Sequence, residues 1–445
     1  MKRLFGTNGV RGITNESMTS DMALALGKAI GSYFQGNIII ATDTRTSNEM
    51  LKNAVLSGLI STGCNVFDAK IAPSPALQYY VKNSDADAGV IITASHNPPE
   101  FNGIKVVDAD GSELAREKES EIEEIYFNEK FKKAGWNEIG KVFDIDILDF
   151  YMEGILSLVE PEKIKEKKLK IVVDCGNGAG CYTMPYLLSQ VADVITLNAQ
   201  PDGNFPGRNP EPSIDNVRDL MKTVKASEAD LGIAYDGDAD RAIFVDENGN
   251  FIYGDKTLAL VAGYKVEEKK GIVVTPVSTS SCVEEYVKSK GGEVLYTKVG
   301  APIVARKMIE VSAVFGGEEN GGLIFPEHQY CRDGGMASIS VVEIIAKKER
   351  KISELIKEIP SYGMFKAKVK CAESAKIMEK LKEKISGNKF DYTDGIKAYF
   401  EEGWVLIRPS GTEPLIRIYA ESSDEEKAKK IAEKYKKIIK EMGRD

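Results

Sequence analysis

The fold class follows from residues 38–67, which read IIIATDTRTSNEMLKNAVLSGLISTGCNVF. The isoleucine run at 38–40 predicts a buried strand, residues 48–61 are typical of a helix, and residues 65–67 predict a second strand. A strand, a helix and a further strand in this order form the parallel βαβ unit. We therefore expect an α/β fold with parallel strand pairs.

The same pattern occurs twice more along the chain. Residues 171–173 and 193–195 are predicted strands on either side of a Gly-rich loop and a helix-like stretch. Residues 272–274 and 293–295 are predicted strands on either side of a Ser/Thr loop and a helix that starts near Ser281. Three copies of one pattern predict three related α/β domains.

Each copy is followed by another short apolar strand that ends in a distinctive loop. The strand and loop pairs are 89–92 with Thr93-Ala94-Ser95-His96, 231–234 with Asp236-Gly237-Asp238-Ala239-Asp240-Arg241, and 313–315 with Gly317-Glu318-Glu319-Asn320-Gly321-Gly322. Loops at strand ends are where α/β proteins place their sites, so we expect these three to serve one shared site.

The C-terminal stretch has a different pattern. A predicted linker at 359–363 precedes strand-like segments at 397–400 and 404–407 and a final helix. Ser423 and Glu426 have the spacing of a capping box, and an apolar stripe follows at Ile431, Tyr435, Ile438, Ile439 and Met442. These features predict a small α+β fourth domain. A further helix is expected at 21–33 in the first domain. The predicted domains are then 1–150, 151–252, 253–365 and 366–445.

Composition narrows the class of protein. The 445 residues are 42% hydrophobic and 29% charged, as in a globular protein with several cores. A net charge of −9 disfavours binding to nucleic acid or to an anionic membrane surface. The sequence shows neither a signal region nor an apolar run long enough for a membrane span, which predicts a cytoplasmic protein. Its six scattered cysteines predict free thiols rather than a zinc site.

Ser95 is the predicted nucleophile. It follows the apolar run at 90–92 and precedes the turn signal Asn97-Pro98, which predicts a hydroxyl on a tight loop at the tip of a strand. The chain has two histidines, His96 and His328. Because adjacent side chains of an extended segment point apart, we expect His96 to face away from Ser95. With no Gly-x-Ser-x-Gly motif around Ser95, ordinary hydrolase chemistry is disfavoured.

Asp236, Asp238 and Asp240 are predicted metal ligands. Alternate residues of an extended loop face the same way, so the three carboxylates should converge, and they would repel one another without a divalent cation. Oxygen-only ligands suit Mg²⁺. An EF-hand is the alternative, with Glu247 at its twelfth position, but Arg241 stands where its glycine is needed and a strand precedes the loop. A solvated acidic turn is the other alternative.

Two cationic segments are candidates for phosphate binding. Arg408-Pro409-Ser410-Gly411-Thr412-Glu413-Pro414, with Arg417 on the following strand, offers hydroxyls, backbone N–H groups and guanidinium forks. The segment Phe5-Gly6-Thr7-Asn8-Gly9-Val10-Arg11-Gly12 places one arginine in a glycine-spaced loop. The alternative for each segment is an ordinary turn with a surface arginine.

Further polar groups follow the first and third strand-end loops. Lys105 comes shortly after the Ser95 loop, where it could stabilise charge or move a proton, or be only a solvated lysine. Glu318 and Asn320 are the kinds of groups that hold sugar hydroxyls, although a plain acidic turn would look similar.

With these loops in order, the chain resembles the α-D-phosphohexomutase family, which includes phosphoglucosamine, phosphomanno- and phosphoglucomutases. The motifs at 93–98, 236–241, 317–321 and 408–414 appear in the family's order, and the resemblance runs essentially from end to end. It implies three related α/β domains with mixed sheets and a small, mobile C-terminal α+β domain around a central cleft. The version of the third motif in this chain is similar to the archaeal branch.

The resemblance also implies roles for individual residues. Ser95 would carry the phosphoryl group, and Asp236, Asp238 and Asp240 would bind one Mg²⁺ per chain together with phosphoserine 95. Arg11, Lys105 and Arg241 would line the reaction centre. Glu318 and Asn320 would hold sugar hydroxyls. The phosphate that is not transferred would bind to Arg408, Ser410, Gly411, Thr412 and Arg417.

Two positions depart from the family pattern. Many members have serine where Asn320 stands and histidine where Gly322 stands. Asn320 can still donate and accept hydrogen bonds, whereas the missing histidine removes an acid/base candidate. His328, six residues further on, is a possible replacement.

The activity implied is interconversion of hexose 6-phosphate and hexose 1-phosphate through a 1,6-bisphosphate, by an enzyme that is a monomer or a homodimer and binds a phosphosugar. Lys105 would move the proton, with Arg11 assisting, and would need a lowered pKa. The segment 5–12 looks most like the opening of phosphoglucosamine mutases, with phosphomannomutase or phosphoglucomutase activity as the alternative. More distant alternatives are a phosphatase with Asp236 or Asp238 as nucleophile, and a non-catalytic sugar- or Ca²⁺-binding protein.

Overall fold

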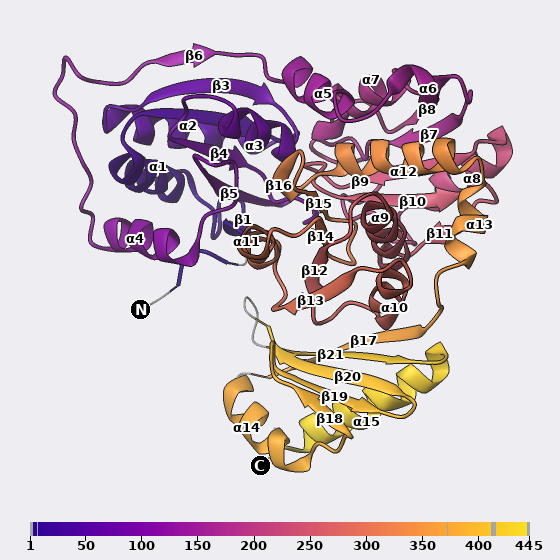
Figure 1. The fold of residues 1–445 in the computed structure, drawn as a ribbon. Coiled ribbons are helices and arrows are strands. Elements are labelled where there is room, and N and C mark those ends of the chain that lie inside the picture. The colour runs from indigo at the N-terminus through magenta and orange to yellow at the C-terminus, as the bar shows by residue number, and fades with distance from the viewer. Residues whose placement is uncertain (1–2, 7, 372, 411–414, 443–445) are drawn as a thin grey trace. The chain divides into compact units, whose positions relative to one another are not determined.

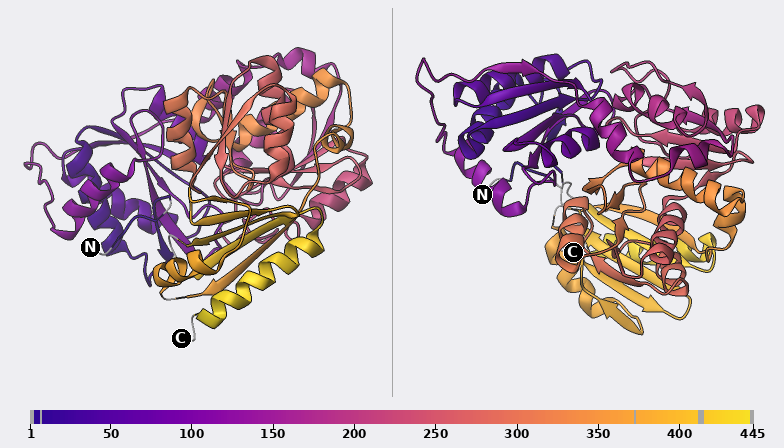
Figure 2. Two further views of the ribbon diagram at one scale, coloured as in Figure 1. Left: turned by 60° about the horizontal axis from the view of Figure 1, so that its bottom comes forward. Right: turned by 45° about the horizontal axis from the view of Figure 1, so that its top comes forward.

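The computed structural model describes residues 3–6, 8–371, 373–410 and 415–442. The chain forms two compact units, one of residues 1–257 with 320–356 and one of residues 258–319 with 357–445. Figure 1 labels the elements, and Figure 2 gives two further views. None of the described helices is long and apolar enough to cross a membrane.

The first unit begins with a six-stranded mixed sheet. Its strands lie in the order β1-β5-β4-β2-β3-β6, with β2, β3, β4 and β6 parallel and β1 and β5 antiparallel to their neighbours. One face packs on α1, α2 and α4, and the other meets α3. The elements are β1 (Val10–Ile13), α1 (Ser20–Phe34), β2 (Asn37–Thr42), α2 (Asn48–Ser61), β3 (Asn65–Ile71), α3 (Ser74–Lys82), β4 (Ala88–Ile92), β5 (Phe101–Asp108), α4 (Arg116–Phe127) and β6 (Val142–Asp144).

A second mixed sheet in the same unit repeats this design. Its order is β11-β10-β9-β7-β8, with parallel pairing between β7, β8 and β9 and antiparallel pairing of β10 with β9 and β11. The elements are α5 (Leu148–Leu156), α6 (Pro161–Lys165), β7 (Lys170–Asp174), a 3₁₀ turn (Ala179–Tyr182), α7 (Met184–Ser189), β8 (Asp193–Leu197), α8 (Arg218–Ser227), β9 (Leu231–Tyr235), β10 (Ala242–Asp246) and β11 (Phe251–Ile252).

The third copy of the pattern lies in the second unit. Strand β12 pairs in parallel with β13 and β14, as the sequence predicts. The predicted strand at 313–315 is observed two residues later, as β14. The elements are α9 (Gly254–Glu268), β12 (Ile272–Pro276), α10 (Ser281–Ser289), β13 (Glu293–Thr297), α11 (Ala301–Val311) and β14 (Phe315–Gly317).

A hairpin and two helices complete the first unit. Strands β15 and β16 pair antiparallel with a register shift, and α12 follows with Asp333 as its N-cap. The buried side chains of α12 run along nearly its whole length, as expected of a helix surrounded by other elements. The elements are β15 (Leu323–Phe325), β16 (Gln329–Arg332), α12 (Gly334–Lys348) and α13 (Ile352–Lys357).

The C-terminal segment is the predicted α+β domain. Five antiparallel strands lie in the order β17-β21-β20-β19-β18, and α14 and α15 cover one face of the sheet, where Figure 2 shows α15 as the yellow helix. The elements are β17 (Gly363–Lys370), α14 (Ser374–Lys384), β18 (Lys389–Asp391), β19 (Ile396–Phe400), β20 (Gly403–Pro409), β21 (Leu415–Ser422) and α15 (Glu425–Met442).

The start of α15 corrects one prediction. The N–H of Lys427 donates to the Asp424 carboxylate over 2.9 Å, so Asp424 rather than Ser423 caps the helix. A charged carboxylate at the positive end of a helix dipole is a stronger acceptor than a hydroxyl one residue earlier. The apolar stripe is confirmed, because Tyr435, Ile439 and Met442 are buried in the core under the sheet.

Candidate active site

Ser95 lies in a tight turn after β4. Its φ of +53° is in the left-handed region, which is uncommon for a residue with a side chain. The Ser95 N–H donates to Thr93 Oγ1 over 2.8 Å. Because the turn is not extended, the expectation that His96 faces away is wrong: His96 Nδ1 lies 3.4 Å from Ser95 Oγ.

Arg45, just after β2, holds this turn from behind. Its buried guanidinium donates to four backbone carbonyls, those of Ser95 (2.9 Å), Asn97 (2.6 Å), Pro98 (2.6 Å) and Phe101 (2.8 Å). It is also paired with the Asp43 carboxylate over 3.0 Å. An arginine fork that satisfies the carbonyls of one loop fixes the path of that loop. Sequence reasoning missed Arg45, although its alternation with Asp43 in the loop after a strand was visible.

The three aspartates lie in a turn rather than in an extended loop. The Ala239 N–H donates to the Asp236 carbonyl over 3.1 Å, and Ala239 has a φ of +56°. The carboxylates therefore converge through the turn, and the predicted reason, alternation along an extended segment, is wrong. Strands β9 and β10 flank the turn and Glu247 binds Ser353 instead, so the EF-hand alternative is excluded.

Gly237 lets the aspartate turn approach the serine turn. A Cβ at this position would lie 2.5 Å from the Ser95 carbonyl oxygen, closer than any real side chain could come. The contact brings Ser95 Oγ to 2.8 Å from Asp236 Oδ2, to which it donates. Ser95 and the three aspartates are almost completely buried. The structure thus places the predicted nucleophile directly beside the predicted metal ligands.

The carboxylates fit a metal ion. One oxygen from each of Asp236, Asp238 and Asp240 lies within 4.8 Å of the others. Oδ1 of Asp238 and Oδ1 of Asp240 are buried and have no hydrogen-bond partner among the described residues. Buried carboxylate oxygens are nearly always satisfied, so two together indicate a cation that both would hold.

Four cationic side chains surround this group. Lys105 Nζ lies 2.6 Å from Asp238 Oδ2 and 3.3 Å from Asp240 Oδ2. Arg11 donates to the Ala94 carbonyl and to Asn97 Oδ1, which places it on the serine turn. Arg241 Nε lies 3.7 Å from Asp240 Oδ1. The fourth is Arg332, whose Nη2 lies 2.6 Å from Asp240 Oδ2. Arg332 was missed because no motif contains it.

Burial and charge shift the pKa values in this group in opposite directions. Burial and the charges of Asp240 and Asp238 raise the pKa of Asp236 well above its ordinary value. Burial acts the same way on Asp238, but Lys105 and Ser74 outweigh it and lower its pKa. Burial would lower the pKa of Lys105, yet Asp238 and Asp240 raise it, so Lys105 is an ammonium here. The expectation of a lowered Lys105 pKa is not met.

The two histidines lie in different environments. Burial, followed by the charges of Arg241 and Arg11, lowers the pKa of His96 far below its ordinary value, so His96 is neutral. His328 is buried and stacked on Tyr79 with ring centroids 4.4 Å apart, and its Nε2 lies 3.3 Å from Asp333 Oδ2. This environment is that of a packed structural histidine and argues against His328 as the replacement for the missing one.

The other predicted residues divide between the units. Asn320 in the first unit accepts the Gly322 N–H, and the next residue, Gly321, accepts the Ala242 N–H at the start of β10. In the second unit Glu318 is buried directly after β14. Ser410 and Arg417 lie in the second unit as well, and Arg408 pairs there with Asp394 over 2.7 Å. Gly411 and Thr412 are outside the described residues.

A row of cations crosses the C-terminal sheet. Arg417 on β21 lies opposite Arg408 on β20 and opposite Lys368 on β17. Directly opposite residues of antiparallel strands share a face, and like charges there are destabilising unless an anion lies between them. Lys368, which no motif contains, adds a third cation to this face of the sheet.

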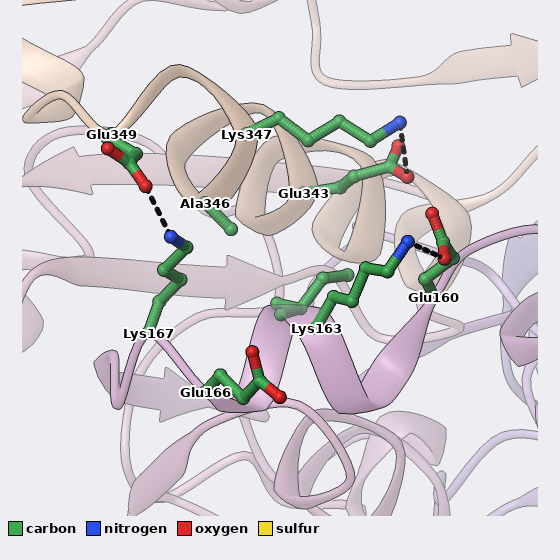
Figure 3. Close-up of a pocket in the computed structure, with 9 residues that line it drawn as sticks. Glu160, Lys163, Glu166, Lys167, Glu343, Ala346, Lys347 and Glu349 are labelled. Carbon is green, nitrogen blue, oxygen red and sulfur yellow. Dashed lines mark hydrogen bonds and ion pairs between the residues drawn. The ribbon is translucent and has the colours of Figure 1, made fainter.

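One surface hollow outside this site is lined mainly by charged residues. It measures about 270 Å³ and lies where α6 and α12 pack together (Figure 3). Figure 3 shows three ion pairs around it: Lys163 with Glu160, Lys347 with Glu343, and Lys167 with Glu349, the last of which joins the two sides. Exposed pairs of this kind contribute little and are no sign of a ligand site, unlike the buried aspartate turn.

Comparison with known proteins gives the same family along the whole chain. Sequence models of four phosphoglucomutase/phosphomannomutase domains match it: α/β/α domain I at residues 2–133, domain II at 149–249, domain III at 253–362 and the C-terminal domain at 367–438.

Individual relatives agree. A phosphoglucomutase/phosphomannomutase of Thermococcus kodakarensis is 48% identical over 99% of both chains. A probable phosphoglucosamine mutase of Methanopyrus kandleri is 43% identical over 99% of this chain and 98% of its own. The crystal structure of a Burkholderia thailandensis phosphoglucomutase/phosphomannomutase family protein superposes with a TM-score of 0.88 at 26% identity, covering 98% of this chain and 97% of its own. The chain belongs to the phosphoglucomutase/phosphomannomutase family, whose members are phosphohexomutases.

Proposed function

We propose that this phosphohexomutase works through a phosphoserine at Ser95 and one Mg²⁺ held by Asp236, Asp238 and Asp240. The observation that carries the proposal is the contact between Ser95 Oγ and Asp236, next to two buried carboxylate oxygens without a partner among the described residues. A nucleophile beside an oxygen-ligand metal site and several fixed cations is the arrangement that phosphoryl transfer needs.

Two transfers make up the reaction. In the first transfer the free hydroxyl of a hexose phosphate bonds to phosphorus and loses its proton, while the bond from phosphorus to Ser95 Oγ breaks and that oxygen takes up a proton. The resulting 1,6-bisphosphate turns over. In the second transfer Ser95 Oγ loses its proton and bonds to the other phosphorus, and the sugar oxygen that leaves takes up a proton to become the product hydroxyl. Mg²⁺, when bound, would offset the negative charge on the transferring group.

The cations around the aspartates have distinct tasks in this scheme. Arg11 touches the serine turn, and Arg241 lies between Asp240 and Glu211, so both can face the transferring phosphoryl group. Lys105 remains our proton-transfer group, and because its pKa is raised it starts as the acid. It would deliver a proton to the departing oxygen and recover one from the attacking hydroxyl.

Substrate binding completes the proposal. Arg408, Ser410, Gly411, Thr412 and Arg417 would hold the phosphate that is not transferred, and Glu318 and Asn320 the sugar hydroxyls. The opposed cations Arg408, Arg417 and Lys368 support this assignment, because an anion relieves their repulsion. Residues 1–150 would supply the serine, 151–252 the metal loop, 253–365 the sugar loop and 366–445 the phosphate loop.

The proposed substrate is glucosamine 6-phosphate. The segment 5–12 and the name of the Methanopyrus kandleri relative support it. Glucose and mannose phosphates are the second candidates, favoured by the name of the Thermococcus kodakarensis relative at 48% identity. Turnover of the 6-phosphates of glucosamine, glucose and mannose, measured side by side, decides between them. A strong preference for mannose 6-phosphate would overturn the first choice.

Ser95→Ala tests the mechanism. The variant should fall by about 10³-fold or more in mutase rate, because no group remains to carry the phosphoryl. Intact mass should show a phosphate adduct on the wild type, after incubation with a hexose 1,6-bisphosphate, that is missing from the variant. Near-normal activity in the variant would refute the serine mechanism. Net phosphate release would favour an aspartate-nucleophile phosphatase, and binding without turnover a sugar-binding protein.

A further inference from the structure

The Arg332 side chain fills the space where a side chain on residue 322 would begin. Gly322 comes directly before β15, and Arg332 ends β16. A Cβ on Gly322 would lie 2.3 Å from Arg332 Cδ and 2.9 Å from Arg332 Cγ. The backbone of Gly322 is outside the left-handed region, so its conformation would accept any residue. Space alone therefore requires glycine at this position: the stem of Arg332 lies where a side chain would start.

The Arg332 side chain passes over Gly322 and reaches the aspartate turn. Its side chain is 6% exposed, and Nη2 lies 2.6 Å from Asp240 Oδ2. Glu113 Oε1 is the other carboxylate oxygen in reach of Nη2, at 3.8 Å. The charge of Arg332 also acts on two other groups of the site, since it contributes to the lowered pKa values of Arg11 and His96. Arg332 is thus part of the reaction centre although it lies 92 residues from Asp240 in the sequence.

The two oxygens of Asp238, and likewise those of Asp240, have different surroundings, although all four are buried. Asp238 Oδ2 is held by Lys105 and by Ser74 Oγ, which donates over 2.5 Å. Asp240 Oδ2 is held by Arg332 and, more weakly, by Lys105. In both residues it is Oδ1 that has no hydrogen-bond partner among the residues described. The cations within hydrogen-bonding distance therefore hold Oδ2 of each carboxylate, and Oδ1 is left for a metal ion, with Arg241 Nε 3.7 Å from Oδ1 of Asp240.

We propose that Arg332 is the positioning residue and counter-charge of Asp240. The missing side chain of Gly322 leaves the space in which the Arg332 side chain lies. Arg332 holds Asp240 Oδ2, turns Oδ1 toward the metal and balances the carboxylates while the metal is absent. The inference rests on the proposed function in one respect, since it takes the aspartate group to be a Mg²⁺ site. It gives a physical reason for the glycine at position 322.

The first experiment compares Arg332→Met with Arg332→Lys in the full-length, dephosphorylated protein. Mg²⁺ binding is measured by calorimetry, the melting temperature without metal by scanning calorimetry, and turnover separately. Removing a positive charge near a dication should tighten Mg²⁺ binding about tenfold in Arg332→Met. The same variant should melt earlier without metal, and its kcat should fall by about 100-fold. Arg332→Lys keeps the charge and should bind Mg²⁺ within about threefold of wild type.

A matched control separates this role from general damage. Arg116 also joins two carboxylates, Glu119 and Glu123, each at 2.9 Å, but on α4. Arg116→Met should leave Mg²⁺ affinity unchanged. If Arg332→Met binds Mg²⁺ with wild-type affinity or more weakly, the counter-charge role is wrong. If the wild type itself binds no Mg²⁺, the proposed function fails together with this inference.

The second experiment tests the shared space. Gly322→His should reproduce Arg332→Met, with tighter Mg²⁺ binding and slower turnover, because the new side chain displaces the arginine from Asp240. In a protein with Arg332→Ala, there is no arginine side chain for the histidine to displace from Asp240. Arg332→Ala combined with Gly322→His should therefore be no worse than Gly322→His alone. Fully additive losses in the double variant would show that the two positions act independently and would overturn the pairing.

Discussion

Asp236 has two partners that its neighbours do not share. It accepts the Ser95 hydroxyl at one oxygen and the Arg241 N–H, over 3.2 Å, at the other. Lys105 and Arg332 bind Asp238 and Asp240 but not Asp236. Burial and the charges of Asp240 and Asp238 raise the pKa of Asp236, although Arg241 Nε lies 4.0 Å from its Oδ2 and opposes the rise. It is therefore the residue at which protons and Mg²⁺ compete.

This competition predicts a pH dependence of metal binding. Because the pKa of Asp236 is raised, the carboxyl stays protonated at pH values where an ordinary aspartate is ionised, and Mg²⁺ must displace that proton. Mg²⁺ affinity should thus weaken as pH falls, by up to about tenfold per unit below the raised pKa. Calorimetry in buffers of different ionisation enthalpy measures the released proton. Asp236→Asn should bind more weakly and release none; proton release from that variant would contradict the assignment.

Residues inside short motifs could be predicted from the sequence, and residues outside them could not. Ser95, Lys105 and the three aspartates lie in or directly after strand-end loops, and the structure brings them within hydrogen-bonding distance of one another. Lys368 reaches its position through the pairing of β17 with the distant strand β21, and Arg332 contacts Asp240, which is 92 residues away; no local pattern encodes either. The orientation of His96 was missed because it depends on the left-handed backbone of Ser95.

At the scale of elements, the Ser95 turn depends on a neighbouring loop for its shape. The turn itself makes few internal backbone bonds, whereas Arg45 supplies donors to four of its carbonyls from the loop after β2. Parallel strands β2 and β4 are adjacent in the sheet, so their carboxyl ends place the two loops side by side. The parallel pairing is therefore what gives the nucleophile a rigid support.

Arg45→Lys should loosen this support while keeping the charge. A lysine offers one ammonium where the guanidinium reaches four carbonyls, so the variant should lose about 3 kcal/mol of stability and transfer phosphate more slowly. Chemical denaturation and the rate of phosphate uptake from a hexose 1,6-bisphosphate measure the two effects. Reduced stability with an unchanged uptake rate would show that the arginine supports the fold but not the nucleophile.

Elements were predicted well wherever a strong periodic pattern and clear end signals coincide. Residues 48–61 form α2 with the predicted bounds, and the paired strands at 38–40 and 65–67 are parallel. The antiparallel strands β1, β10 and β11 were not anticipated; β1 and β11 are short edge strands, whereas the mostly apolar run Ala242–Asp246 of β10 was a strand signal that was overlooked. The strand after Ala313 begins later than predicted, since glycines extend it as Phe315–Gly317.

At the scale of the whole molecule, side chains that alternate along β20 pack the C-terminal sheet against residues that follow β12 within the second unit. Val405 and Ile407 face the core under α15, while Trp404 and Leu406 pack against Val277 after β12. Lys397 Nζ lies 3.8 Å above the Trp404 ring and donates to the Val277 carbonyl. Glu421 accepts the indole N–H over 2.6 Å. One aromatic residue thus anchors the packing of two domains.

Trp404→Ala should weaken this packing by about 3–5 kcal/mol, the usual cost of a cavity left by a large buried side chain. The midpoint of chemical unfolding, followed by circular dichroism, measures the change. Trp136 is the chain's other tryptophan and is 89% exposed, so Trp136→Ala serves as the control and should shift stability by less than about 0.5 kcal/mol. Equal midpoints for the two variants would show that the buried contact does not anchor the sheet.

The left-handed backbone at Ser95 also limits which amino acid can be the phosphate carrier. A β-branched residue is strongly disfavoured at a φ of +53°, so threonine could not follow this turn even though it has the same hydroxyl. Glycine and asparagine fit the turn but have no nucleophilic oxygen. Of the two residues with an aliphatic hydroxyl, serine is the one that fits the left-handed backbone of this turn. The backbone conformation at position 95 therefore prevents an exchange of serine for threonine.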